Sequence, residues 1–304
     1  LGDVYKRQVV VCGDIDQVIT EKCCDVCILA TDSFTVKAYD KIVYLLRKKI
    51  NVISTAEEMS YPKANNPQLA ESMDKIAKEN GVTVLGTGIN PGLIMDLLVV
   101  CLTGCMTDVT HITAKRVNSL SPFGPAVMEE QGVGLSVKDF EEGVRSKKLA
   151  GHVGFRESVN MIGDAIGWKI DGFEQQMAAI VTSVDRKSPY GFAKAGDVAG
   201  VNMTGQGYVN GEVKIDMIHP QQIEPECEGT YTGDYIELKG TPEVNMSIKP
   251  EVDGGIGTIA MCVNMIPHVI NSRPGLVTMI DLPVPRAIMG DFRDFVCPEA
   301  KVVK

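Results

Sequence analysis

Three short apolar runs, each followed by a longer amphipathic segment, set the strongest constraint on the fold of this chain. The runs cover residues 25–31, 51–56 and 82–86. Apolar strands that lack polar alternation and are separated by helical segments are typical of a parallel sheet covered by helices on both faces. The first 104 residues therefore predict an α/β fold built on a parallel sheet.

The segments around these runs carry the spacing and the end signals of helices. Helical segments are expected at 15–20, 35–49, 67–80 and 91–103, and a first short strand at 9–12. Asp14 can cap the first of them, Gly81 can end the third, and Pro91 fits the first turn of the last. The sequence thus predicts successive strand–helix units.

The pattern changes after residue 104. Alternating runs predict strands at 109–117, 177–184, 213–218, 235–238 and 244–248, and helices are expected at 137–144, 158–166 and 258–270. Alternation indicates half-buried strands, so residues 105–304 predict an α+β region with a mainly antiparallel sheet. The helix over 258–270 is expected near the junction with the first region, and residues 273–304 are expected to form an extended tail.

Composition and charge exclude several classes of function. The net charge is −9, which argues against binding to nucleic acid or to an anionic membrane. The longest apolar run, 93–102, is interrupted by Asp96 and is too short to span a bilayer. Nine dispersed cysteines, including the pair Cys24-x-x-Cys27, favour packed, reduced thiols in a cytoplasmic protein over disulfides or a metal site.

The stretch GTGINPG, residues 86–92, lies between an apolar run and a helical segment, as a dinucleotide-binding turn does. Its third glycine is displaced from the usual spacing, and a phosphate-binding turn follows the first strand of such a sheet. We therefore expect the first βαβ unit to be missing before Val9, and residues 1–8 to be non-native. GTGINPG is then a later turn at the ligand-binding edge, or a simple strand–helix connection. The turns ATDSF (30–34) and STAEEMSYP (54–62) are expected at the same edge.

Several stretches together resemble one known family. In chain order they are ATDSF, NVISTAEEMSYP, NGVTVLGTGINPG, SPFGP, QGVG, HPQQI, GDYIELKGTPEVNMSI and GTIAMCVNMIPHVIN. They resemble the 2,4-diaminopentanoate dehydrogenases, relatives of dihydrodipicolinate reductases and native amine dehydrogenases. The resemblance covers residues 9–289, nearly the whole chain, and lacks only the family's N-terminal glycine fingerprint.

The resemblance implies a truncated Rossmann domain over residues 1–104, a catalytic, substrate-binding and dimerisation domain over 105–304, and a cytoplasmic homodimer. It also implies NAD- or NADP-dependent oxidative deamination of 2,4-diaminopentanoate to 2-amino-4-oxopentanoate and ammonia, in ornithine degradation. The sequence does not distinguish NAD from NADP. Two alternatives remain: a reductase similar to dihydrodipicolinate reductase, whose paired-histidine motif is absent, and an inactive fragment without cofactor.

Oxidative deamination needs a base, because only a neutral amine can lose a hydride, and water must then be activated. The resemblance places this carboxylate in the turn after 51–56, at Glu57, with Glu58 as the alternative; a solvated surface pair is the other interpretation. By the same resemblance the cofactor contacts Ala30, Thr31, Ser33, Phe34, Ser54, Thr55, Ala56, Gly88, Ile89, Asn90 and Pro91.

The substrate carries a carboxylate and two amines, and an arginine fork matches a carboxylate. Arg116 is the candidate for this contact, although it could instead be a solvated strand residue. Further candidates for the substrate site are Ser121, His152, His219, Asn264 and His268. His268 follows Pro267 near the end of an apolar helix, where a structural role is the alternative.

Overall fold

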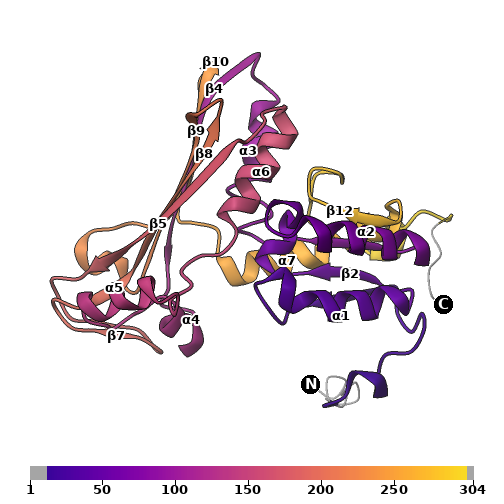
Figure 1. Ribbon diagram of the computed structural model, residues 1–304, viewed down its shortest axis with the longest axis horizontal. Helices are drawn as coiled ribbons and strands as arrows, with labels where there is room; N and C mark the ends of the chain where they lie inside the picture. Colours follow the sequence, from indigo (N-terminus) through magenta and orange to yellow (C-terminus); the bar gives the residue numbers. More distant parts are fainter. Residues whose placement is uncertain (1–11, 300–304) are drawn as a thin grey trace.

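The computed structural model describes residues 12–299, and two large sheets carry its architecture (Figure 1). The first sheet is parallel throughout. In spatial order its strands are β1 (Val26–Leu29), β2 (Asn51–Ser54), β3 (Thr83–Gly86) and β12 (Gly275–Val277). The predicted parallel sheet is thus confirmed. The strand predicted at 9–12, apart from its last residue, and the segment 1–8 lie outside the described residues.

Helices cover both faces of the parallel sheet. One face carries α1 (Thr35–Arg47) and α2 (Pro67–Asn80), and the other carries α7 (Gly254–Asn264) and α8 (Ile266–Asn271). Neighbouring residues of β2 show this division, because fully buried Val52 packs with α1 and α2 while fully buried Ile53 packs with α7 and α8. Burial on both faces explains why the strand sequences are apolar without alternation.

The second sheet has six strands and is mainly antiparallel, as predicted. In spatial order they are β11 (Val244–Ile248), β10 (Gly233–Thr241), β4 (Asp108–Ser119), β9 (Glu212–Gln222), β8 (Val198–Val209) and β5 (Gly172–Val181). Only the pair β4 and β9 is parallel. The α-helices and short strands that accompany this sheet are α3 (Leu97–Thr103), α4 (Pro125–Glu130), α5 (Val137–Arg145), α6 (Phe155–Ile166), β6 (Arg186–Lys187) and β7 (Phe192–Ala193).

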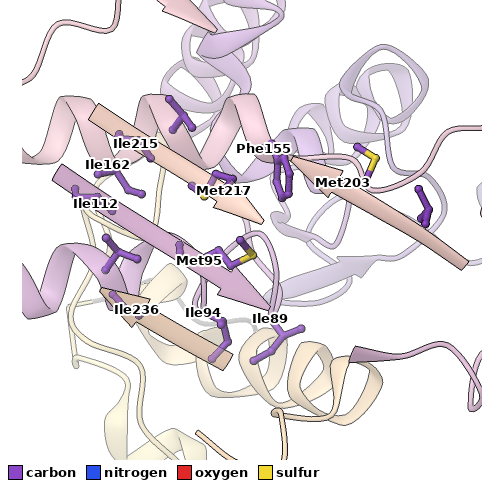
Figure 2. Packing of buried hydrophobic residues seen from close by; sticks show 14 of the residues in the cluster. Ile89, Ile94, Met95, Ile112, Phe155, Ile162, Met203, Ile215, Met217 and Ile236 are labelled. Carbon is purple, nitrogen blue, oxygen red and sulfur yellow. The ribbon is translucent and has the colours of Figure 1, made fainter. Parts of the chain in front are cut away.

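The largest hydrophobic core lies between one face of the second sheet and helices α3 and α6. Figure 2 shows Ile112 of β4 and Ile215 and Met217 of β9 beside Phe155 and Ile162 of α6. All five side chains are at most 1% exposed. At about 25 cal/mol per Å² of buried apolar area, this cluster is a main source of the stability of the second region.

Helix starts differ most from the prediction at two places, and α6 also begins three residues before the expected 158. The helix expected at 91–103 begins only at Leu97, because the side chain of buried Asp96 caps it, accepting the Leu97 N–H at 2.7 Å. The helix expected at 258–270 begins at Gly254 and is divided into α7 and α8 at Met265. The helical turn expected after Asp14 is present as a 3₁₀ turn, Ile15–Gln17, with Asp14 as its N-cap.

The prediction that residues 273–304 form an extended tail is wrong in part. Residues 275–277 of this segment form β12, which pairs with β3 in the parallel sheet. Strand β8 was not predicted, since glycines at 200, 205 and 207 weaken its strand pattern. We propose a domain boundary near residue 104, with β12 as a later segment of the chain that joins the first sheet. Within residues 12–299, no helix combines the length and the apolar character needed to cross a membrane.

Candidate active site

One face of the second sheet changes from apolar to polar along two paired strands. Ile112 and Ala114 of β4 lie on the core face, and the same face continues at Arg116 and Asn118, because side chains alternate along a strand. The partner strand β9 repeats the change: Ile215 and Met217 come first, followed by His219 and Gln221. Asn118 and Gln221 pair directly in the register. The polar ends of both strands therefore meet at one place.

The carboxyl edge of the parallel sheet approaches the same place. As predicted, the turns after β1, β2 and β3 lie together, since Ser33, Glu57 and Asn90 line one cavity. Helix α7 closes this region, because the Thr258 hydroxyl accepts the Ile89 N–H at 3.2 Å. A Cβ atom added at Gly254 would lie 3.8 Å from Arg116 Nη2, so α7 also approaches β4. Figure 1 shows α7 between the two sheets.

The turns of the parallel sheet, α7 and the polar ends of β4 and β9 enclose two connected spaces. The first is a cavity of about 220 Å³ that includes Arg116, His152 and His219 in its lining. The second is a groove of about 910 Å³ along the edge of the parallel sheet, lined by residues of the turns after β1, β2 and β3 and by α7. The residues common to both are Ser33, Glu57, Asn90, Phe123, Val127, Gly254 and Thr258. A ligand in the groove would therefore meet a small molecule in the cavity.

Glu57 stands at this junction. Burial raises the pKa of its carboxyl, and the charges of Glu130 and Glu58 raise it further, while a hydrogen bond with the Ser33 side chain opposes the change. A carboxyl with a raised pKa holds and releases a proton closer to neutral pH, as a general base or acid requires. The backbone begins a 3₁₀ turn at Glu57 and ends it at Ser60, whose hydroxyl donates to the Glu57 carbonyl at 2.8 Å.

Glu58 has a different environment. Its Oε2 accepts the Thr35 N–H at 2.8 Å and the Asn66 amide at 3.2 Å. Thr35 is the first residue of α1, so this carboxylate caps the positive end of the helix dipole. Glu58 lines neither the cavity nor the groove. Its contacts are those of a residue that holds the turn.

Arg116 is buried, with 2% of its surface exposed, and its charge is paired. Its Nη1 donates to Asp234 Oδ1 at 2.6 Å, and its Nη2 donates to the Val252 carbonyl at 2.5 Å. A guanidinium has five N–H groups, so three remain for other partners. Asp234 also accepts the Val252 N–H, and this fixes the pair on the wall of the cavity.

Two neutral histidines lie side by side in the cavity. The ring centroids of His152 and His219 are 4.7 Å apart in an edge-to-face arrangement. Burial lowers the pKa of His152 to about 3, and burial together with the His152 neighbour lowers the pKa of His219 well below its usual range. His219 Nδ1 donates to the Arg116 carbonyl at 2.8 Å. Asn90 Nδ2 donates to His152 Nε2 at 3.3 Å. Both rings therefore offer polar but uncharged surface.

The glycines of GTGINPG serve close packing of the turn. A Cβ at Gly86 would lie 2.0 Å from the Met59 carbonyl oxygen. Gly92 has φ +127°, and a Cβ there would lie 2.4 Å from the Gly88 nitrogen. This compact turn directs Ile89 and Asn90 to the cavity. The stretch is therefore a site-forming turn of the third described strand, as its displaced third glycine indicated.

The structure divides the residues predicted for the cofactor into three groups. Those that line the groove are Ala30, Thr31, Ser33, Thr55, Gly88, Asn90 and Pro91. Phe34 and Ile89 line the cavity instead. Ser54 and Ala56 line neither, because both are buried under the turn, where Ser54 Oγ accepts the Ala56 N–H at 3.2 Å. Their part in the site is to shape the backbone that carries Glu57.

Three residues predicted for the substrate lie away from the cavity lining. Ser121 Oγ accepts the Glu224 N–H at 2.9 Å and so joins two loops. Asn264 Oδ1 accepts the Ile288 N–H at 3.3 Å. His268 is buried on α8, the helix that packs on the parallel sheet. None of the three lines the cavity, so our proposal for the substrate keeps Arg116, His152 and His219 from the predicted set.

The sequence did not point to four polar residues that line the cavity: Asn118, Glu130, Gln131 and Gln221. A signal for two of them was present, because Arg116-x-Asn118 and His219-x-Gln221 place polar side chains two apart on strands whose earlier residues on that face are apolar.

The pair Cys24 and Cys27 packs against the core of α1 and α2, and burial raises the pKa of both thiols, that of Cys24 to about 11.

Comparison with known protein families gives a match over most of the chain. The family described as the 2,4-diaminopentanoate dehydrogenase C-terminal domain matches residues 93–297. Among curated relatives, a 2,4-diaminopentanoate dehydrogenase from Acetoanaerobium sticklandii is 66% identical over 299 residues, which is 98% of this chain and 85% of the relative. An amine dehydrogenase from Streptomyces virginiae is 22% identical over 271 residues, covering 83% of this chain and 75% of the relative.

Among solved structures, an amine dehydrogenase from Mycobacterium smegmatis is similar in fold. The superposition gives a TM-score of 0.77 at 24% sequence identity and covers 87% of this chain and 77% of the other. At this identity the likeness concerns the fold alone.

Proposed function

The chain belongs to the 2,4-diaminopentanoate dehydrogenase family, and from this premise we propose which residues of its cleft carry out the reaction. A member of this family is an oxidoreductase that acts on a carbon bearing an amine. We propose that the substrate is 2,4-diaminopentanoate and that the products are 2-amino-4-oxopentanoate and ammonia. The position of Glu57 where the groove meets the cavity supports this assignment most directly.

The groove suits a nicotinamide dinucleotide, NAD or NADP. It follows the carboxyl edge of a parallel sheet, where such ligands bind in open α/β folds. Gly88 and Gly255 leave its wall without side chains, and the buried Asn90 Oδ1 has no partner among the described residues, so it can accept from an amide N–H. A bound nicotinamide would take the hydride from the carbon that carries the reacting amine. Thr31, Thr55 and Asn90 would hold it there.

Glu57 acts as the base. Its carboxylate removes a proton from the substrate ammonium, which is necessary because only the neutral amine can give up a hydride from its carbon. Burial strengthens this carboxylate as a base through its raised pKa. After this proton passes to solvent, the restored negative charge stabilises the iminium that forms on the substrate. The carboxylate then takes a proton from the water that adds to the iminium, and collapse of this adduct releases the ketone and ammonia.

Arg116 binds the substrate carboxylate. Its guanidinium is fixed by Asp234 and the Val252 carbonyl, so the free N–H groups are already oriented. A cavity of about 220 Å³ has room for a small amino acid. The neutral rings of His152 and His219 close the cavity without adding charge. We also propose a homodimer and a cytoplasmic role in ornithine degradation, as the resemblance implies.

The test compares Glu57→Gln with Glu58→Gln. Formation of reduced nicotinamide from 2,4-diaminopentanoate is measured across pH, with NAD and with NADP, on this chain and on a version extended by the residues of the Acetoanaerobium relative that lie outside the aligned 299. Loss of a general base commonly lowers the rate by about 10²–10⁴-fold, so Glu57→Gln should fall in that range with little change in cofactor affinity.

Glu58→Gln should retain most of the rate, because Glu58 holds the turn from outside the cavity. A severe defect in Glu58→Gln alone would move the base by one residue. Near-wild-type rates for both variants would remove the turn after β2 from the mechanism. An extended chain that does not oxidise the diamino acid with either cofactor would refute the proposed substrate, and activity as a reductase of dihydrodipicolinate would favour the alternative.

A further inference from the structure

The charges on the cavity wall are few. Among its lining residues only Glu57, Glu130 and Arg116 have charged side chains, since the pKa of both histidines is lowered. Arg116 already has Asp234 as a partner behind the wall. The lining thus offers two carboxylates and one guanidinium with free N–H groups. An occupant that matches this pattern carries two cationic groups and one anionic group.

The uncharged polar atoms on the wall give the same indication. Four buried amide atoms of lining residues have no hydrogen-bond partner among the described residues: Asn90 Oδ1, Asn118 Oδ1, Gln131 Oε1 and Gln221 Nε2. Three are acceptors and one is a donor. Buried polar atoms are normally satisfied. Asn90 Oδ1 can accept from the amide of a bound nicotinamide, so a substrate with several N–H donors suits the other two acceptors. Ammonium groups bring such donors, and a carboxylate suits the single amide nitrogen.

Glu130 is the uncommitted carboxylate of the lining. It ends α4, and within residues 12–299 its side chain takes part in no hydrogen bond or ion pair, although its carbonyl accepts the Gly151 N–H at 3.4 Å. It is an exposed residue that nevertheless lines the cavity, so it stands where the cavity opens to solvent. Its charge acts on Glu57 across the cavity. Glu57 and Glu130 therefore line the same cavity and can contact one occupant.

We propose that Glu130 is a specificity-determining residue that binds the second, non-reacting ammonium of the substrate. This inference rests on the proposed function: the C4 amine reacts at Glu57, the carboxylate binds Arg116, and the C2 ammonium binds Glu130, with the amide oxygen of Gln131 beside it. Each of the three charged groups of a diamino acid then has an opposite charge on the wall. The site selects a 2,4-diamino acid over a monoamine of the same chain length.

The experiment compares 2,4-diaminopentanoate with 4-aminopentanoate, which lacks only the C2 amine. Binding of each compound is measured by titration calorimetry, and kcat/KM is measured for each in the extended enzyme. The variants are Glu130→Gln, which removes the charge, and Glu130→Asp, which keeps it. Glu129→Gln is the matched control, because Glu129 is the preceding residue on α4, is exposed and lines neither space.

We expect Glu130→Gln to lower the ratio of kcat/KM for the two substrates about tenfold through KM, since the contact lies between an exposed ion pair and a buried charge-assisted hydrogen bond. Glu130→Asp should restore part of the preference, and Glu129→Gln should keep the wild-type ratio. An unchanged ratio in Glu130→Gln, or equal losses for both compounds, would overturn the role of Glu130 and leave the proposed function intact. A wild-type enzyme that oxidises neither compound refutes the proposed function itself.

Discussion

Replacing Glu157 by Gln should make the chain more stable at alkaline pH. Glu157 lies on α6 with 1% of its surface exposed, and its Oε1 accepts the Asn65 amide at 2.6 Å. Burial raises the pKa of this carboxyl to about 7 from an ordinary value of 4.5, and the charge of Glu58 contributes in the same direction. The ionised form is therefore unfavourable in the folded chain.

The sign and size follow from proton linkage. Between pH 4.5 and about 7 the folded chain holds a proton on Glu157 that the unfolded chain has lost. The unfolding free energy therefore decreases as pH rises through this window. Each pH unit of pKa difference corresponds to about 1.4 kcal/mol, so the full loss is about 3 kcal/mol above pH 7. Glutamine keeps the acceptor for Asn65 and cannot ionise.

The assay is urea denaturation at pH 5 and pH 8. The difference between Glu157→Gln and wild type should grow by about 2–3 kcal/mol from the lower to the higher pH. Glu141→Gln serves as the control, because Glu141 is exposed on α5 and has no hydrogen bond or ion pair among the described residues. A difference that is the same at both pH values would refute the claim that burial raises this pKa.

Two further substitutions test the walls of the site. Asp234→Asn leaves the buried Arg116 charge without its partner and should lower the unfolding free energy by about 3 kcal/mol, measured by denaturant titration; an unchanged midpoint would contradict the ion pair. Gly92→Ala places a Cβ 2.4 Å from the Gly88 nitrogen at φ +127°, so it should lower the free energy of unfolding by about 2 kcal/mol or more. Gly290→Ala is the control, because a Cβ there has no atom within 4 Å and should change this free energy little. Equal thermal midpoints for the two variants would contradict the close packing at Gly92.

The parallel sheet and its site-forming turns could be predicted because the signals are local. Each apolar run is continuous, and each run ends where its turn begins. Parallel strands joined by helices bring those turns to one edge, so Ser33, Glu57 and Asn90 could be expected together before any contact was known. Helix α2 was predicted with its observed bounds, because Pro67 and Gly81 mark its two ends.

The polar wall of the cavity could not be predicted in the same way, because its residues meet through strand pairing. Asn118 and Gln221 are neighbours only in the parallel register of β4 and β9, and the sequence does not specify that register. Glu130 and Gln131 reach the cavity from the end of α4, a short helix with weak sequence signals. Asn264 and His268 were expected in the site because their helix was expected near the junction, but neither residue lines the cavity or the groove.

Helix α6 explains how two separate sheets hold one reaction geometry. Its Glu157 accepts from Asn65 and its Asp164 accepts from Tyr61, and both partners belong to the loop that follows Glu57. Its Ser158 donates to Asp96 at 3.0 Å, and Asp96 also accepts the Gly92 N–H, which ends GTGINPG.

The turns after β2 and β3 are thus tied to one helix, and the core of Figure 2 fixes that helix to the strands that carry Arg116. A change that loosens α6 should therefore move Glu57 relative to Arg116 before it unfolds either sheet. Glu157→Gln keeps the acceptor for the Asn65 amide, so this tie between α6 and the turn after β2 should persist in the variant at every pH.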